Sequence, residues 1–251
     1  MAPAEPVRIA MWSGPRNIST AMMRSFGNRP DTRVVDEPFY AAYLDLTGID
    51  HPMRNEVIAS GTTDWRRVAD DLLSFDAEGI SVHYQKQMTH HMLPEIGRDW
   101  LARMKNAFLI RRPENVLASY VRKREAVTLE DIGFLQQAEL FDLVADALGE
   151  PPPVIDARDV LEDPKGMLAA LCGAVGIPFR DEMLAWDPGF RATDGVWGAH
   201  WYEAVAASTG FGPPNPDVED LPPHLLRIAE AARPIYDRLS QVKLAPVAAA
   251  D

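Results

Sequence analysis

Short apolar runs alternate along the chain with longer stretches in which apolar residues recur at helical spacing. The apolar runs are bounded by turn-forming residues, as is typical of buried β-strands. They predict strands over residues 7–12, 33–35, 80–84, 107–110 and 154–155. The helical spacing predicts helices over residues 18–26, 64–75, 94–104, 113–122, 134–148 and 164–175, and a last one that carries Leu225 to Leu239.

The order of these elements indicates the fold class. Alternating strands and helices are typical of an α/β domain in which helices cover both faces of a parallel sheet. We therefore expect a single domain with one central parallel β-sheet flanked by helices. Ligands of such sheets bind beyond the carboxyl ends of the strands, so the residues that directly follow a strand are the first candidates for a site.

The length and composition fit one domain. The chain has 251 residues, 47% of them hydrophobic, and a single core keeps growing until about 250–300 residues. We expect the domain to span residues 1–251, with its core over about 7–240 and a frayed tail over 244–251. We expect neither a membrane span, which needs about 20 apolar residues, nor a signal peptide. The lone Cys172 fits a reducing compartment, so a cytoplasmic location is predicted.

The charge balance narrows the range of partners. With 37 acidic and 25 basic residues, the net charge is −12. Such a chain repels nucleic acid and anionic membrane surfaces, so neither is expected as a partner. An anionic small molecule has to be met by a local basic cluster, and the sequence holds candidates for one.

The first predicted strand–helix turn has the composition of a phosphate-binding loop. Residues 13–20 read Ser-Gly-Pro-Arg-Asn-Ile-Ser-Thr, and the N-terminus of the helix that follows favours an anion through its N–H groups and dipole. Gly14 permits a sharp turn, Arg16 adds a cation, and Ser19 and Thr20 add hydroxyl donors. The same residues also fit an ordinary loop with a Ser or Thr helix cap. The ATP-binding pattern G-x-x-x-x-G-K-[ST] is absent, because no lysine precedes Ser19.

A second turn carries paired arginines. The apolar run 107–110 is followed by Arg111, Arg112 and Pro113, and Ser119 lies further along the predicted helix. Proline is favoured in the first turn of a helix, so the helix start is fixed and Arg111 projects from the strand end beside it. A guanidinium suits a phosphate because its planar fork donates two parallel hydrogen bonds. Taken alone, an arginine pair is also a common solvated surface feature.

Both turns resemble motifs of the sulfotransferases that use 3′-phosphoadenosine-5′-phosphosulfate (PAPS), bacterial cytosolic members in particular. The 5′-phosphosulfate loop of that family commonly reads P-[KR]-S-G-[TS]-T, and its 3′-phosphate motif reads R-[ND]-P-x-[DE]-[VA]-x-x-S. This chain departs from the first at Asn17-Ile18 and from the second at Arg112 and Asn115. The resemblance implies that the nucleotide is bound by Gly14, Pro15, Arg16, Asn17, Ile18, Ser19, Thr20, Arg111 and Ser119.

A third stretch extends the resemblance. Residues 154–164 are followed by a predicted helix and by Val-Gly-Ile-Pro-Phe at 175–179. They look like the late segment of the same family, a strand with E-D-L-x-x-D-P and then a helix that ends in L-G-[LIV]-P. Asp163 and Pro164 fit a helix start, and Gly176 fits a helix end. The resemblance thus covers about residues 7–179, and it implies the P-loop-like sulfotransferase fold.

The resemblance also suggests catalytic residues. Sulfuryl transfer to a hydroxyl needs a base for the acceptor proton and cations for the leaving phosphate oxygen. Arg16 and Lys86 stand where the family has its leaving-group cations. Cytosolic members have a histidine two residues after that lysine, where this chain has Met88, so Glu37 is the expected base and His90 the alternative.

The function that this resemblance implies is transfer of a sulfuryl group from PAPS to a small-molecule hydroxyl or amine, which releases 3′,5′-adenosine diphosphate. Two other hypotheses stay open: a P-loop-like small-molecule kinase that uses ATP and Mg²⁺, and a non-catalytic nucleotide-binding module. No metal site is expected, because the adjacent histidines at 90 and 91 lack a Cys or acidic partner at ligand spacing. Aromatic residues around 197–211 suit either a wall of the acceptor site or a packed helix over 199–207.

Overall fold

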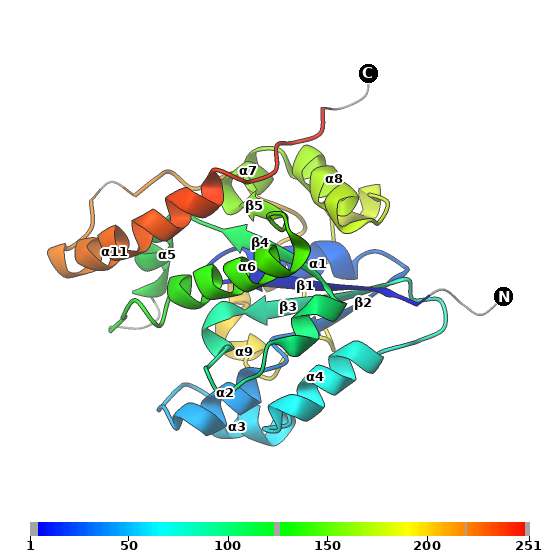
Figure 1. Ribbon diagram of the computed structural model, residues 1–251. Helices are drawn as coiled ribbons and strands as arrows, with labels where there is room; N and C mark the ends of the chain where they lie inside the picture. The colour runs from blue at the N-terminus through cyan, green and yellow to red at the C-terminus, as the bar shows by residue number, and fades with distance from the viewer. Residues whose placement is uncertain (1–4, 123–125, 219, 249–251) are drawn as a thin grey trace.

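A five-stranded parallel β-sheet forms the centre of the protein, in the order β2-β3-β1-β4-β5 (Figure 1). The computed structural model describes residues 5–122, 126–218 and 220–248. A strand lies at each of the five predicted places, and all neighbouring strands run parallel, as expected. The bounds are Val7–Ser13 (β1), Thr32–Asp36 (β2), Val82–Met88 (β3), Lys105–Ile110 (β4) and Val154–Asp156 (β5).

Helices cover both faces of the sheet (Figure 1). The described helices are α1 (Ser19–Gly27), α2 (Tyr40–Thr47), α3 (Arg54–Ser60), α4 (Trp65–Ser74), α5 (Pro113–Tyr120), α6 (Phe134–Leu148), α7 (Ala157–Glu162), α8 (Pro164–Val175), α9 (Gly198–Trp201), α10 (Glu203–Ala206) and α11 (Pro223–Ser240), with 3₁₀ turns at Thr89–His91 (η1), Asp99–Arg103 (η2) and Asp181–Leu184 (η3). The short helices α2, α3 and α7 were not predicted, because none presents a long periodic pattern.

The prediction of a helix over residues 94–104 is wrong. Only the 3₁₀ turn η2 forms there. The Arg98 side chain donates hydrogen bonds to the carbonyls of Met92, Leu93 and Ile96. Those carbonyls are therefore satisfied without the N–H groups of a continuing helix.

Strand β3 is longer than predicted, and this changes the position of Lys86. The apolar run ends at Tyr84, yet the strand continues to Met88 and every one of its residues is buried. It pairs with β2 on one side and β1 on the other, so Asp36 lies directly opposite Lys86. Lys86 therefore belongs to a central strand rather than to the loop after it.

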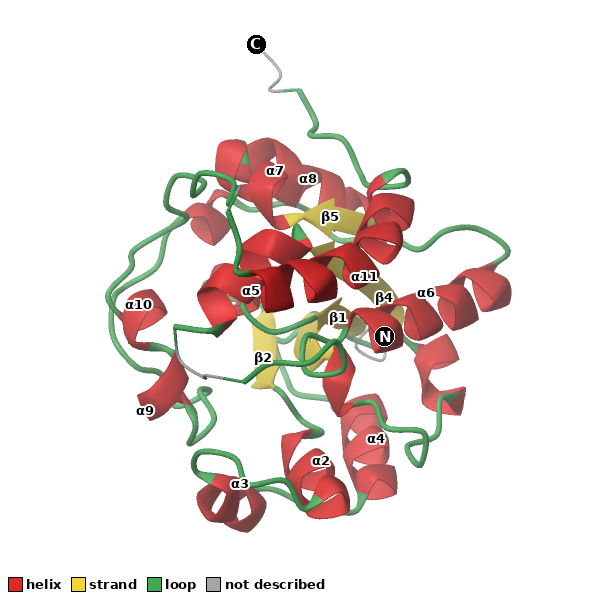
Figure 2. Cartoon of the chain, turned by 90° about the vertical axis from the view of Figure 1, so that its left-hand side faces the viewer, coloured by secondary structure: helices red, strands yellow, loops and turns green. Residues whose placement is uncertain are grey.

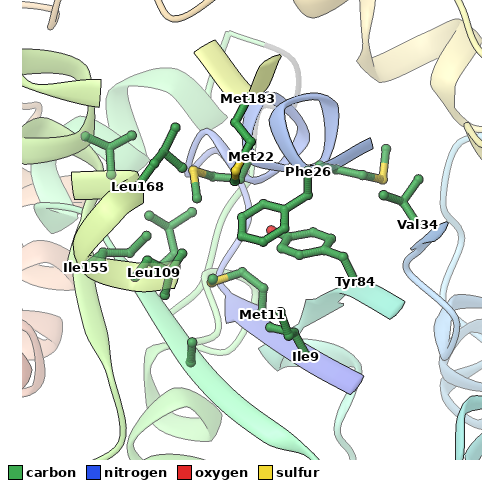
Figure 3. Close-up of a cluster of buried hydrophobic side chains, with 14 of the residues drawn as sticks. Ile9, Met11, Met22, Phe26, Val34, Tyr84, Leu109, Ile155, Leu168 and Met183 are labelled. Carbon is green, nitrogen blue, oxygen red and sulfur yellow. The ribbon is translucent and has the colours of Figure 1, made fainter. Parts of the chain in front are cut away.

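The two faces of the sheet bury separate hydrophobic clusters. Side chains alternate along β1, so Ile9 and Met11 enter one cluster and Ala10 and Trp12 the other. Figure 3 shows the first cluster, in which the rings of Phe26 and Tyr84 stack with centroids 4.2 Å apart. The first cluster buries residues of α1 and α8, and the second buries residues of α4 and α6. Both clusters hold in place the strands whose carboxyl ends carry the candidate site.

The tail that was expected to fray is attached to the domain along its described part. The N–H of Leu244 donates to the carbonyl of Val154 in β5 at 2.8 Å, and the N–H of Val247 donates to the carbonyl of Gly166 in α8 at 3.1 Å. These backbone bonds hold residues 244–247 against the edge of the sheet, and residues 249–251 lie outside the described part.

Candidate active site

A cavity of about 420 Å³ lies at the carboxyl ends of the strands. Figure 2 views this edge of the molecule, where α5, α9, α10 and α2 are arranged around the strand ends. The cavity is lined by every site residue predicted from the sequence except Gly14: Pro15, Arg16, Asn17, Ile18, Ser19, Thr20, Glu37, Lys86, His90, Arg111 and Ser119. The topology thus gathers residues that are far apart in the sequence.

Gly14 acts on the site through packing. A Cβ atom at this position would lie 2.4 Å from the carbonyl oxygen of Ile132, closer than any side chain can approach. The glycine therefore lets the loop after β1 pass against the backbone at Ile132. The positive φ angles of the loop belong to Arg16 (59°) and Ile18 (33°) instead. Ile18 occupies the position at which the family pattern has glycine, so this loop adopts a glycine-like backbone without the glycine.

The N-terminus of α1 opens into the cavity. Ser19, Thr20 and Ala21 of its first turn line the wall, and the first N–H groups of a helix have no partner within the helix. No acidic residue occurs in this turn. Asn17 fixes the approach to the helix, because its buried amide donates to the carbonyl of Leu109 in β4 at 2.7 Å. The arrangement favours an anionic group.

Two arginines lie beside this helix start without a carboxylate partner. Arg16 Nε donates to Ser119 Oγ at 3.1 Å, and Arg111 Nη1 donates to the carbonyl of Arg16 at 2.6 Å. Neither guanidinium forms an ion pair with any described residue. Burial lowers the pKa of both, and nearby arginines lower it further, although Asp156 opposes this at Arg111. This end of the cavity thus carries uncompensated positive charge.

The two departures from the family's 3′-phosphate motif have a common role. Arg112 Nη1 contacts Asp217 Oδ2 at 2.6 Å, and Asn115 Nδ2 donates to Asp217 Oδ1 at 3.3 Å. The side-chain oxygen of Asn115 also accepts from the N–H of Val218 at 3.1 Å. Both side chains therefore hold residues 217–218, the end of a loop whose earlier residues, Phe211 to Pro213 and Asn215, line the cavity.

Lys86 at the other end of the cavity has all three N–H donors engaged. Its Nζ lies 2.9 Å from Asp36 Oδ1, 2.5 Å from Glu37 Oε1 and 2.5 Å from the Tyr202 hydroxyl. Burial lowers the pKa of Lys86, but the attraction of Asp36 and Glu37 outweighs it and the pKa is raised. Lys86 therefore stays protonated, and its charge is balanced by Asp36 and Glu37.

Asp36 and Tyr202 complete this buried network, and neither was among the catalytic or nucleotide-binding residues predicted from the sequence. Asp36 accepts hydrogen bonds from Lys86, from the Tyr202 hydroxyl and from the N–H of Gly195. The Tyr202 hydroxyl accepts one from Trp197 Nε1 at 3.0 Å. Burial raises the pKa of Asp36 and that of Tyr202. The one signal for Asp36 was its place at the end of a strand, directly before Glu37.

Glu37 lies at the boundary between this network and the cavity. Its φ of 42° is unusual for a residue with a side chain, and its N–H donates to the carbonyl of Lys86 at 3.0 Å. One carboxylate oxygen contacts Lys86, and the other lies 4.0 Å from His91 Nε2. Glu37 thus lines the cavity while its carboxylate lies between Lys86 and His91.

The histidine nearest Glu37 is His91, whereas the sequence suggested His90. The ring of His91 stacks between Tyr40 and Tyr43, with centroids at 4.6 and 4.8 Å. Neither of its nitrogens has a hydrogen-bond partner in the described part of the chain. Burial lowers the pKa of both His90 and His91 well below the usual value, and the charge of Lys86 contributes in each case. Both rings are neutral at pH 7.

The late aromatic segment is both helical and part of the wall. In place of one helix over 199–207, α9 and α10 are separated at Tyr202. Trp201, Tyr202, Val205 and Phe211 line the cavity opposite Tyr40. In the described ranges, no group of three or more His, Cys, Asp or Glu side chains is arranged to hold a metal ion. The described helices include none that is long and apolar enough to cross a membrane.

Comparisons with known proteins find one matching family model and two curated relatives. The sequence model of a family described as "Sulfotransferase domain" matches residues 7–241. Branched-chain-amino-acid aminotransferase-like protein 1 of Arabidopsis thaliana is 37% identical over 243 residues, which are 96% of this chain and 43% of that protein. For protein 2 of the same name and organism the identity is 33% over 233 residues, which are 92% and 41% of the two chains. The chain thus spans less than half the length of these curated relatives.

Two solved structures share the fold. A sulfotransferase from Alicyclobacillus acidocaldarius gives a TM-score of 0.54 at 12% identity, over 95% of this chain and 96% of that one. The sulfotransferase domain from the Curacin biosynthetic pathway gives 0.51 at 18% identity, over 91% and 98%. At these identities the likeness shows the fold alone, which is a single α/β domain with a parallel sheet flanked by helices.

Proposed function

The chain belongs to the sulfotransferase domain family, and on that premise we propose that it transfers a sulfuryl group from PAPS to a hydroxyl or amine of a small molecule. One observation carries the proposal: Arg16 and Arg111 lie beside the N-terminus of α1 without a carboxylate partner among the described residues. Half-buried cations of this kind are stabilised when an anionic ligand supplies the missing charge.

The proposed donor site follows from this arrangement. Residues 15–20 and the first turn of α1 bind the 5′-phosphosulfate through backbone N–H groups, the hydroxyls of Ser19 and Thr20, and Arg16. Arg111 and Ser119 bind the 3′-phosphate. The contact of Arg16 Nε with Ser119 Oγ, at 3.1 Å, means that these two parts of the site adjoin.

In the proposed transfer step, the acceptor oxygen or nitrogen attacks the sulfur, and the bond from sulfur to the 5′-phosphate oxygen breaks. Glu37 takes the proton that the acceptor loses. Arg16 meets the negative charge that grows on the leaving phosphate oxygen, and a preorganised donor of this kind acts chiefly in the transition state. The product 3′,5′-adenosine diphosphate keeps its contacts with Arg111.

Lys86 takes part in a way that depends on Glu37. All three of its N–H groups are engaged, so it can donate to the leaving oxygen only after it gives up a partner. When Glu37 takes up the acceptor proton, its carboxylate loses its charge and its hold on Lys86 weakens. One N–H of Lys86 then becomes available at the moment when the leaving group needs a cation.

The two alternatives have weaker support. A kinase needs an acid that holds Mg²⁺, but Asp36, which ends strand β2, is bound to Lys86, Tyr202 and Gly195. Asp156 accepts from the N–H of Arg158 and from the hydroxyl of Tyr236. Nucleotide binding without activity does not explain why Glu37 lies at the wall of the cavity beside the phosphate loop.

The test is transfer of labelled sulfate. The protein is incubated with [³⁵S]PAPS and with phenols, alcohols and amines in separate pools, beside parallel reactions with [γ-³²P]ATP and Mg²⁺. We expect ³⁵S in an acceptor and an equal amount of 3′,5′-adenosine diphosphate. Transfer of ³²P would establish the kinase. Binding of 3′,5′-adenosine diphosphate without transfer in any pool would favour the binding module.

A further inference from the structure

A second, smaller hollow adjoins the large cavity at the end that carries Arg16 and Arg111, which we call the nucleotide end. Its volume is about 20 Å³, and it shares Arg111, Leu161 and Asn215 with the large cavity. Its other lining includes Arg112, Asn115, Asp156, Arg158 and Asp217. The sequence analysis proposed neither Arg158 nor Asp217 as a binding residue, and the family's 3′-phosphate motif contains neither. Three guanidinium groups thus surround a space beside the position proposed for the 3′-phosphate.

Asp217 occupies the anion position between two of these guanidiniums. Its Oδ2 lies 2.6 Å from Arg112 Nη1 and 2.9 Å from Arg158 Nη1, and its Oδ1 accepts from Asn115. The charges of Arg112 and Arg158 outweigh the desolvation of the carboxyl group and lower the pKa of Asp217. A carboxylate held by two arginines and an amide has the same hydrogen-bonding partners that a phosphate requires.

The carboxylate belongs to a partly exposed residue of a loop. Residues 211–218 form neither helix nor strand, and the side chain of Asp217 is 30% exposed. Asp156, the other acid in the lining, is fixed as the N-cap of α7 by the N–H of Arg158 and is bound to the Tyr236 hydroxyl. A phosphate at Arg111 therefore repels Asp217, and Asp217 is the acid that moves.

We propose that Asp217 is a built-in substitute for the 3′-phosphate of the nucleotide. In the nucleotide-free protein it neutralises Arg112 and Arg158. When the nucleotide binds, its 3′-phosphate displaces Asp217, and Arg158 joins Arg111 as a phosphate-binding residue. The inference rests on the proposed function, because it requires a 3′-phosphorylated nucleotide.

The exchange connects the nucleotide end of the cavity to the acceptor wall. The loop that ends at Asp217 carries Phe211 and Asn215, which line the large cavity. When Asp217 is displaced, this loop loses an ionic anchor at one end, while the bridge between Gly210 and Ala185 holds the other. Nucleotide binding thereby frees part of the wall to adjust to an acceptor.

The experiment compares two ligands that differ only in the 3′-phosphate. Calorimetric titrations with 3′,5′-adenosine diphosphate and with 5′-AMP are run on the unmodified chain, on Asp217→Asn and on Arg158→Ala. Asp220→Asn serves as the control for the loss of one negative charge nearby. We expect Asp217→Asn to bind 3′,5′-adenosine diphosphate about tenfold more tightly and Arg158→Ala to bind it about tenfold more weakly, with 5′-AMP unchanged in both.

Opposite directions for the two variants distinguish exchange from simple anchoring. If Asp217→Asn weakens 3′,5′-adenosine diphosphate or leaves its affinity unchanged, Asp217 only positions the arginines and the inference is overturned. A gain that Asp220→Asn reproduces, or that extends to 5′-AMP, overturns it as well, because that effect is one of net charge. If the unmodified chain does not discriminate between the two ligands, the proposed function itself fails.

Discussion

The two ends of the cavity differ in whether their cations have carboxylate partners. At the nucleotide end, Arg16 and Arg111 have backbone and hydroxyl partners but no ion pair with a described carboxylate. At the acceptor end, Lys86 is bound by Asp36, Glu37 and Tyr202. Lys86 is fully buried and Arg16 and Arg111 are half-buried, and the two ends differ above all in the counter-charges that the chain supplies.

The difference indicates which ligand each end accepts. A half-buried cation without a counter-charge is stabilised when an anion binds, so the nucleotide end suits phosphate and sulfate groups. At the acceptor end the two carboxylates outnumber the single lysine, and the neighbouring histidines are neutral. An acceptor with its own negative charge would be repelled there, so we expect a neutral or cationic acceptor, held against the aromatic side chains of Tyr40 and Trp201.

The largest effect should come from removing the carboxylate at the acceptor end. Glu37→Gln keeps the shape of the side chain but cannot take the acceptor proton. Loss of a general base costs about 10²–10⁴-fold in rate, so kcat should fall by that factor while 3′,5′-adenosine diphosphate still binds. Turnover of this variant is measured beside His90→Asn. An active Glu37→Gln with an inactive His90→Asn would assign the base to histidine.

Removing the unpaired cation should give the next largest effect. Arg16→Ala takes away a donor that acts when charge grows on the leaving oxygen, and loss of one such donor costs about 10²–10³-fold in kcat. Nucleotide affinity should change less than kcat, because the growing charge exists only in the transition state. The measurement is steady-state kinetics in PAPS. A rise in KM alone would reduce Arg16 to a simple binding residue.

Gly14→Ala should damage the nucleotide end through packing alone. The new Cβ atom would lie 2.4 Å from the Ile132 carbonyl, and overpacking of this kind destabilises by about 1–3 kcal/mol. The matched control is Gly173→Ala in α8, where a Cβ atom meets nothing within 4 Å and stability should rise by about 0.5–1 kcal/mol. Urea unfolding measures both. Equal effects of the two substitutions would contradict the close approach at Ile132.

The smallest expected effect is on the pH dependence of stability, and it comes from His91 at the acceptor end. Burial and the charge of Lys86 lower the pKa of His91. As the pH falls below about 6.5, the unfolded histidine takes up a proton that the folded one refuses, so stability falls by up to about 1.4 kcal/mol per pH unit. His91→Asn should make this slope shallower, with the exposed His224→Asn as the control for losing an imidazole. An unchanged slope in His91→Asn would mean that this ring is not held neutral by the fold.

The strands were predictable because four of the five are short apolar runs. Only the first half of strand β3 was predicted, since its second half contains Gln85, Lys86 and Gln87. A lysine is buried in a central strand only when a partner neutralises it, and here that partner is Asp36 on the neighbouring strand. The pairing joins residues 50 positions apart, so no local sequence pattern indicates it.

The candidate site was predictable to the same degree. Residues that follow strands meet at one edge of a parallel sheet, which is why Arg16, Glu37 and Arg111 were found from their positions and motifs. The contacts of Lys86 with Tyr202 and of Arg112 with Asp217 span more than 100 positions. Such contacts depend on how late loops fold back over the sheet, which the sequence pattern does not specify.

If the nucleotide end recognises a 3′-phosphorylated adenosine nucleotide through Arg111, this preference should appear in the thermal unfolding of the protein. At about 100 times its Kd, a ligand adds about 2.7 kcal/mol of stability. We predict a clear rise in Tm with 3′,5′-adenosine diphosphate, a smaller one with 5′-AMP or with ATP and Mg²⁺, and loss of that preference in Arg111→Ala. A larger rise with ATP and Mg²⁺, or a preference that persists in Arg111→Ala, would contradict the account.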